Sequence, residues 1–392
     1  MSRATQLLVV TRKELRDAFR DRRAIYSVLL GSLFGPILIG VMLNAIAGRQ
    51  REVRDLTLPV VGMDHAPALV EWLRQQKGVT VVPGPADPES AVRERREDVV
   101  VIIPADYEKK FSASRPVEIR VVSDGSRNTT RPKVQRARSL LQGYASQVAA
   151  LRLIGRGVSP MVVTPLQLQE LEVSSAQQRA AQVLNFIPMF IVLAAFTGGM
   201  QIATDSTAGE RERGSLEALL VNPAPRAVIV GGKWLAAALS AALSVAITTT
   251  LCLLLLRFIP MAELGLRFRL GPAQVGWMVA AVLPVCLLST SIQLYLSTFA
   301  RSFKEAQTYM GYLVMVTTAP AVLSSVYPFA SQPWMYPMPI VGQHLLAVEV
   351  LGGKTPAPWL FAASALMVLT AAMVLVRMTT RNLQSERVIF AR

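Results

Sequence analysis

The stretch AIYSVLLGSLFGPILIGVMLNAIAG, residues 24–48, contains no Asp, Glu, Lys or Arg. It is long enough to cross a bilayer core of about 30 Å as a single helix. Five more uncharged windows follow along the chain: 180–204, 234–256, 270–300, 306–348 and 355–376. Soluble helices need a polar face, and uncharged blocks of this length do not provide one. The sequence therefore predicts an α-helical integral membrane protein.

Prolines and charged residues set the expected boundaries of the spans. Several prolines interrupt the second half of the longest window, so we expect a span over 306–326 and an irregular outer loop over 327–354. This gives six transmembrane helices, at 24–48, 180–204, 227–256, 272–300, 306–326 and 355–377. An even number of spans places both ends of the chain on the same side of the membrane.

Lys and Arg residues near the span ends predict the orientation. The first 23 residues carry seven basic residues against three acidic ones, and the tail 378–392 is also basic. We therefore expect both termini and the loop 205–226 in the cytoplasm. Segment 1–23 also carries an apolar stripe at helical spacing, which predicts an interfacial amphipathic helix in contact with membrane lipids. The stripe consists of Leu7, Leu8, Thr11, Leu15, Ala18 and Phe19.

Residues 49–179, between the first two spans, have the composition of a soluble domain. Short β-type runs alternate there with helical stretches, which predicts an extracytoplasmic α/β domain. The expected strands are Thr57–Val61, Val79–Val82, Val99–Ile103 and Val117–Val122.

The chain lacks the motifs of the common catalytic and metal sites. It has two His and two Cys residues, and it contains no zinc-protease His-Glu pair and no Gly-x-Ser-x-Gly motif. We therefore expect no catalytic residues, no metal and no bound cofactor. The net charge of +15 does not indicate a nucleic-acid partner, because twenty basic residues lie in 49–179 and fifteen acidic residues offset them there.

Polar residues in or beside the spans are candidates for a substrate pathway. We single out Gln201, Asp205, Thr290 and Gln293. The alternative at each position is a hydrogen bond between packed helices, which is common in membrane proteins.

The most informative cytoplasmic segment is DSTAGERERGSLEALLVNP, residues 205–223. A dense charge cluster is followed by an amphipathic helical turn. Its apolar face carries Leu216, Leu219 and Leu220, and Pro223 ends it. The run from Gly209 to Leu220, with Pro223, resembles the cytosolic signature of type-2 ABC transporter permeases. It is especially similar to that of the bacterial sodium-exporter-type branch.

This resemblance implies a permease subunit in a bacterial inner membrane that pairs with itself or with a second permease. It also implies a separate ATP-binding subunit, which would hold ATP and Mg, and a coupling helix at about 210–221 that docks on that subunit. The residues that match the coupling signature are Gly209, Glu210, Arg213, Gly214, Leu216, Glu217, Leu220 and Pro223. The implied function is export of sodium, or otherwise of a drug, lipid or peptide. The alternative is a membrane-anchored sensor that binds an external ligand through its α/β domain.

Overall fold

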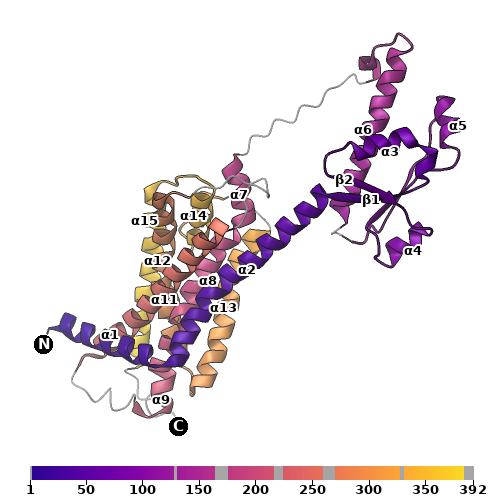
Figure 1. Ribbon diagram of the computed structural model, residues 1–392. Helices are drawn as coiled ribbons and strands as arrows, with labels where there is room; N and C mark the ends of the chain where they lie inside the picture. Colours follow the sequence, from indigo (N-terminus) through magenta and orange to yellow (C-terminus); the bar gives the residue numbers. More distant parts are fainter. Residues whose placement is uncertain are drawn as a thin grey trace. The chain divides into compact units, whose positions relative to one another are not determined.

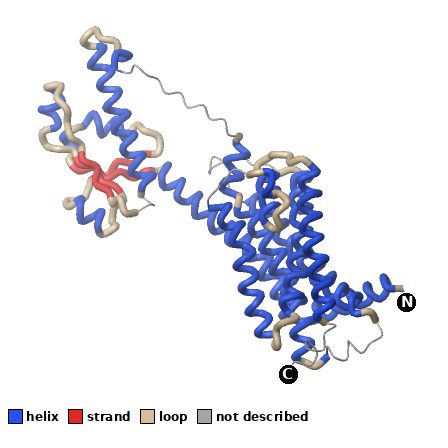
Figure 2. Tube along the Cα trace, turned by 180° about the vertical axis from the view of Figure 1, so that it is seen from behind, coloured by secondary structure: helices blue, strands red, loops and turns tan. Residues whose placement is uncertain are grey.

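The computed structural model describes residues 2–127, 130–163, 175–215, 224–258, 270–326 and 331–383. The chain divides into two compact units, one of residues 1–44 and 174–392 and the other of residues 45–173. The first unit is helical, and the second combines a small sheet with helices (Figures 1 and 2).

Long helices that run side by side make up the first unit (Figures 1 and 2). Its elements are α1 (Arg3–Arg20), α2 (Arg22–Arg54, which continues into the second unit), α7 (Ala176–Leu184), α8 (Phe186–Thr204), η3 (Asp205–Gly209), α9 (Glu210–Glu212), α11 (Arg226–Phe258), α12 (Pro272–Ser297), α13 (Phe303–Val326), η4 (Pro333–Met335), α14 (Val341–Leu351) and α15 (Pro358–Asn382).

Within the described residues, five helical segments are long and apolar enough to cross a membrane. They are Ala24–Gly48, Ala180–Glu212, Arg226–Phe258, Pro272–Ser297 and Pro358–Asn382. The span expected over 306–326 forms the helix α13, but this helix is not among the five. It contains several polar residues, among them Gln307, Thr317 and Thr318. A sixth span therefore stays a prediction.

Glycines allow α2 to pack closely on α8. Gly31 and Gly35 lie one turn apart, and a Cβ atom at either would come within 3 Å of Thr197 or Phe190. Between them, the Ser32 hydroxyl lies 2.7 Å from the hydroxyl of Ser244 on α11. This is the small-residue packing with interhelical hydrogen bonds that is typical of membrane helices.

The amphipathic helix α1 lies across the end of the bundle at which α9 is found (Figure 1). Its expected apolar stripe divides in two. Thr11 is buried, and its hydroxyl lies 3.3 Å from the Gly232 carbonyl oxygen of α11. Leu8 and Phe19 are instead more than 60% exposed. One part of the stripe thus packs α1 against the bundle, and the other part is exposed, as expected of side chains that contact membrane lipids.

The second unit is built on a four-stranded sheet with the order β2-β1-β3-β4. β1 pairs in parallel with β2 and β3, whereas β4 is antiparallel to β3. The first three strands begin within one residue of the expected starts, and β4 begins three residues later than expected. The elements are β1 (Leu56–Val61), η1 (Met63–His65), α3 (Pro67–Arg74), β2 (Val79–Pro83), α4 (Pro88–Arg93), β3 (Val99–Ile102), α5 (Tyr107–Ser112), β4 (Arg120–Ser123), α6 (Arg131–Ile154) and η2 (Pro160–Val163).

Candidate functional site

The charged segment after α8 begins with a wide helical turn. Residues Asp205–Gly209 form a π-helix, in which the chain bonds to the fifth residue along instead of the fourth. The Asp205 carboxylate accepts two hydrogen bonds from the Arg213 guanidinium, at 2.8 and 3.2 Å. The hydrogen bond to Asp205 raises the pKa of Arg213. Both side chains are about half exposed, so this pair contributes little to stability.

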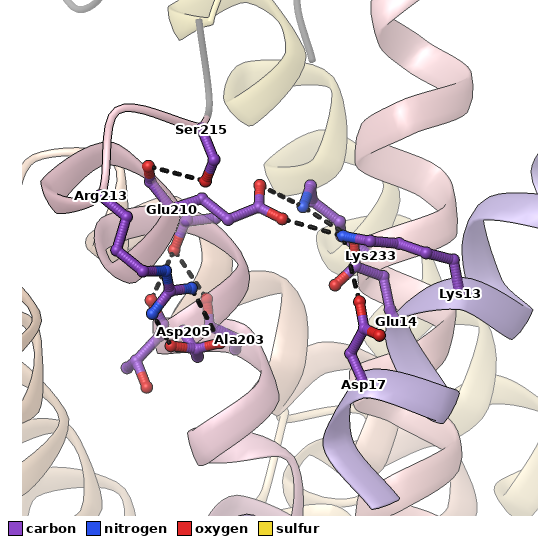
Figure 3. Close-up of polar contacts among 11 residues, drawn as sticks. Lys13, Glu14, Asp17, Ala203, Asp205, Glu210, Arg213, Ser215 and Lys233 are labelled. Carbon is purple, nitrogen blue, oxygen red and sulfur yellow. Dashed lines mark hydrogen bonds and ion pairs between the residues drawn. The ribbon is translucent and has the colours of Figure 1, made fainter. Parts of the chain in front are cut away.

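The close approach of Asp205 explains why glycine occupies position 209. A Cβ atom at Gly209 would lie 2.6 Å from the Asp205 carboxylate, which is too close for a larger residue without a shift. Gly214 then ends the segment with a φ of 67°, a conformation that favours glycine. Of the four charged side chains just before it, Glu210 reaches toward Lys233 and Arg213 turns back to Asp205 (Figure 3).

A buried ion network joins three helices at this end of the bundle. The ammonium of Lys233, on α11, lies 2.9 Å from the Glu14 carboxylate of α1 and 2.7 Å from the Glu210 carboxylate of α9. Lys13 lies 3.1 Å from each of the same two carboxylates (Figure 3). We refer to Lys13, Glu14, Glu210 and Lys233 as the four-residue ion network. Its two positive and two negative charges balance.

Burial makes this network energetically important. The side chains of Glu14, Glu210 and Lys233 are each less than 10% exposed, whereas Lys13 is about half exposed. Burial by itself lowers the pKa of Lys13, but the charges of Glu14 and Glu210 outweigh that effect and raise it above its ordinary value. Lys13 is therefore positively charged across the physiological range. Removing one member of such a network leaves an uncompensated buried charge.

The same segment also contacts the connection between α12 and α13. Arg211 donates hydrogen bonds to the carbonyl oxygens of Thr298 and Ala300, at 3.0 and 2.7 Å. The Glu212 carboxylate accepts a bond of 2.7 Å from the backbone N–H of Phe303, the first residue of α13. Residues 205–215 thus contact α1, α11 and the start of α13 at once.

The coupling residues expected from the sequence divide into two groups. Gly209, Glu210, Arg213 and Gly214 are described, and Glu210 points into the ion network instead of away from the chain. The remaining four, Leu216, Glu217, Leu220 and Pro223, lie outside the described residues. Contact of either group with an ATP-binding subunit stays a prediction.

The four candidate pathway residues do not come together at one place. Gln201 and Asp205 line the same cavity. Thr290 and Gln293 are fully buried on α12 and do not line it. The Gln293 amide donates to the Phe196 carbonyl oxygen of α8 at 2.5 Å, and the Thr290 hydroxyl donates to a carbonyl of its own helix at 2.7 Å. The Gln293 amide thus bonds α12 to α8 while its Oε1 atom has no hydrogen-bond partner, and a role of either residue in a substrate pathway stays a prediction.

Sequence reasoning missed Lys233 and Glu14 as members of the site. A signal for Glu14 was present, because it falls on the face of α1 that carries Leu7, Thr11 and Ala18, where an acid is unexpected. Lys233 directly precedes the uncharged window 234–256, but it lies inside the span expected over 227–256, and a charged residue within a span was the signal for it. Among the described residues, no group of three or more His, Cys, Asp or Glu is placed to hold a metal ion.

Comparison with known proteins gives two findings. The model of the ABC-2 family transporter proteins matches residues 8–338. The chain is also similar to the ABC transporter permease protein NatB of Bacillus subtilis (strain 168), with 27% identity over 372 residues. That alignment covers 93% of this chain and 95% of the relative.

Proposed function

This chain belongs to the ABC-2 family of transporter proteins and is a multi-pass transmembrane subunit of an ABC transporter, and from that premise we propose that it is the permease of an ATP-driven exporter. The observation that supports a coupled machine is the four-residue ion network. It ties α1 and α9 to α11, one of the five helices that could cross a membrane. A force on either short helix would therefore reach a long one through buried contacts.

The proposed partner is a separate ATP-binding subunit that docks on residues 209–223 and on α1. ATP and Mg would bind to that subunit, as in ABC transporters whose permease subunits carry no ATPase. We further propose that two permease copies pair, that the membrane is the inner membrane of a bacterium, and that both termini face the cytoplasm. The basic residues of segments 1–23 and 378–392 support this orientation.

We propose sodium as the first substrate to test, and an amphipathic drug, lipid or peptide as the second. Sodium rests on the similarity of residues 209–223 to the sodium-exporter-type signature. The second class needs only an apolar cavity beside the helices, and the structure contains one. The comparisons do not support the alternative of a membrane-anchored sensor.

Transport by the reconstituted complex tests this function. The chain is reconstituted with its ATP-binding subunit in liposomes, and ATP and Mg are added outside, so that complexes with outward ATP sites pump cargo into the lumen. We expect ATP-dependent accumulation of radioactive sodium, which disappears when Mg is chelated. Accumulation of an amphipathic dye but not sodium would shift the substrate to the second class. ATP-dependent accumulation of neither sodium nor any member of the second class, whether a drug, a lipid or a peptide, would contradict an exporter.

A further inference from the structure

An apolar groove lies beside the junction of α1 and α2. It has a volume of about 110 Å³, and its walls come from α1, α2, α8 and α11. The first of these helices contributes Leu15, Ala18 and Phe19. All of the lining residues except Gln201 and Ser240 are apolar. We refer to this feature as the α1–α2 groove.

The α1–α2 groove opens on the side of the bundle that would face lipid. Phe19, Leu29 and Leu243 line it, and each of these side chains is more than 40% exposed. Leu29 and Leu243 belong to two of the helical segments that could cross a membrane, Ala24–Gly48 and Arg226–Phe258. In a bilayer, the apolar molecules next to such helices are lipid acyl chains.

The size of the groove suits part of one acyl chain. A dry cavity of about 150 Å³ holds a benzene molecule, so a groove of about 110 Å³ has room for roughly four carbons. Because the groove is open to the lipid side, the rest of the chain can stay in the bilayer.

A row of unpaired arginines lies next to the groove. Arg12, Arg16 and Arg20 are exposed and follow one side of α1 at a spacing of four residues. Phe19, which lines the groove, lies within one helical turn of both Arg16 and Arg20. Over the residues that the structure describes, none of these three guanidinium groups has an ion-pair partner.

The acidic residues of this segment bind elsewhere. The Glu14 carboxylate lies 2.9 Å from the ammonium of Lys233 and 3.1 Å from that of Lys13. The Asp17 carboxylate lies 3.5 Å from the ammonium of Lys13, and Asp21 also has a partner. The side of α1 that carries the arginines therefore keeps its positive charge, directly beside an apolar groove.

We propose that the α1–α2 groove binds an anionic phospholipid. Part of one acyl chain lies in the groove, and the phosphate lies against Arg16 and Arg20. Attraction between basic side chains and an anionic headgroup then acts together with burial of apolar surface on one molecule. The amphipathic pattern of segment 1–23 predicts contact with lipids of any kind, whereas this site selects a lipid by its charge. The inference goes beyond the proposed function, because it requires neither a cargo nor the ATP-binding subunit.

Native mass spectrometry of the purified full-length chain tests the proposal. The chain, in detergent micelles, receives equal amounts of dioleoylphosphatidylglycerol and dioleoylphosphatidylcholine, which share their acyl chains and differ in net headgroup charge. We expect the chain to retain the phosphatidylglycerol at least about tenfold more often than the phosphatidylcholine. Arg16→Gln together with Arg20→Gln should lower this preference at least about fivefold, since each basic residue near an anionic lipid contributes about that factor.

A matched double variant separates the site from net charge. Arg377→Gln together with Arg381→Gln removes the same charge from exposed positions of α15, outside the groove, and should leave the preference unchanged. Equal retention of the two lipids by the wild type would overturn the proposal. An equal loss of preference in both double variants would overturn it too, because it would show an effect of net charge alone.

Filling the groove tests the position of the acyl chain. Val28 lines the groove, so Val28→Phe should lower the retention of phosphatidylglycerol severalfold. Val316→Phe makes the same change at an exposed position of α13 and should have no effect. Elution in size-exclusion chromatography shows whether each variant is folded. Wild-type retention of phosphatidylglycerol by folded Val28→Phe would overturn the binding of a chain in this groove.

Discussion

Lys233 is the residue on which the structure of the cytoplasmic segment depends most directly. It is 1% exposed and lies within 3 Å of two carboxylates that come from different helices. Such burial is tolerated because each charge finds a partner of opposite sign at hydrogen-bonding distance. Removing the ammonium leaves Glu14 and Glu210 with only the half-exposed Lys13 between them.

We predict that Lys233→Met lowers the free energy of unfolding by about 3–5 kcal/mol, the range for breaking a buried ion pair. Cys252 and Cys286 are free and buried, so a thiol-reactive dye reports unfolding as both become accessible. The second change Glu210→Gln should recover part of the loss, because it rebalances the charges. Lys110→Met, in an exposed pair with Asp106, is the control and should have little effect. If Lys233→Met unfolds at the wild-type temperature, the network does not hold these helices together.

At the scale of elements, the position of α1 depends on a glycine of α11. A Cβ atom at Gly232 would lie 2.5 Å from Cγ1 of Val10 and 3.2 Å from the backbone N of Thr11. Only a glycine lets α1 approach closely enough for Glu14 to reach Lys233, the next residue along α11. The contact between the two helices and the ion network therefore form together.

Two glycine-to-alanine variants test the close contact between α1 and α11. We expect one of them to stabilise the chain and the other to destabilise it. A Cβ atom at Gly276, inside α12, would meet no other atom within 4 Å, so Gly276→Ala should stabilise the chain by up to about 1 kcal/mol through helix propensity. Gly232→Ala should instead destabilise it and expose α1 to trypsin at Arg12 and Arg16. If trypsin cleaves α1 no faster in Gly232→Ala than in the wild type, other contacts hold α1 in place.

At the scale of the whole molecule, the uncharged windows predicted the long helices well, because the cost of burying charge in lipid acts on each segment locally. The arrangement around Glu210 could not be predicted in the same way. Glu14 and Lys233 are 219 positions apart in the sequence, and only tertiary packing brings them together. The π-turn at Asp205–Gly209 has no sequence period of its own, and it moves every following side chain around the helix axis. For this reason Glu210, expected to face a partner, lies inside.

We predict that the ATP-binding subunit docks on residues 209–223 of this chain, and the affinity of that subunit for the purified chain measures this contact. Glu217→Arg reverses one charge in that segment, and Glu108→Arg makes the same change on an exposed position of α5 in the other unit. We predict that the Glu108→Arg chain binds the ATP-binding subunit and stimulates ATP hydrolysis like the wild type. The Glu217→Arg chain should elute as a folded protein in size-exclusion chromatography. Its affinity for the ATP-binding subunit should fall at least about tenfold, or about 1.4 kcal/mol, and it should lose most of the stimulation of ATP hydrolysis. Wild-type affinity and stimulation in Glu217→Arg would contradict docking on this segment.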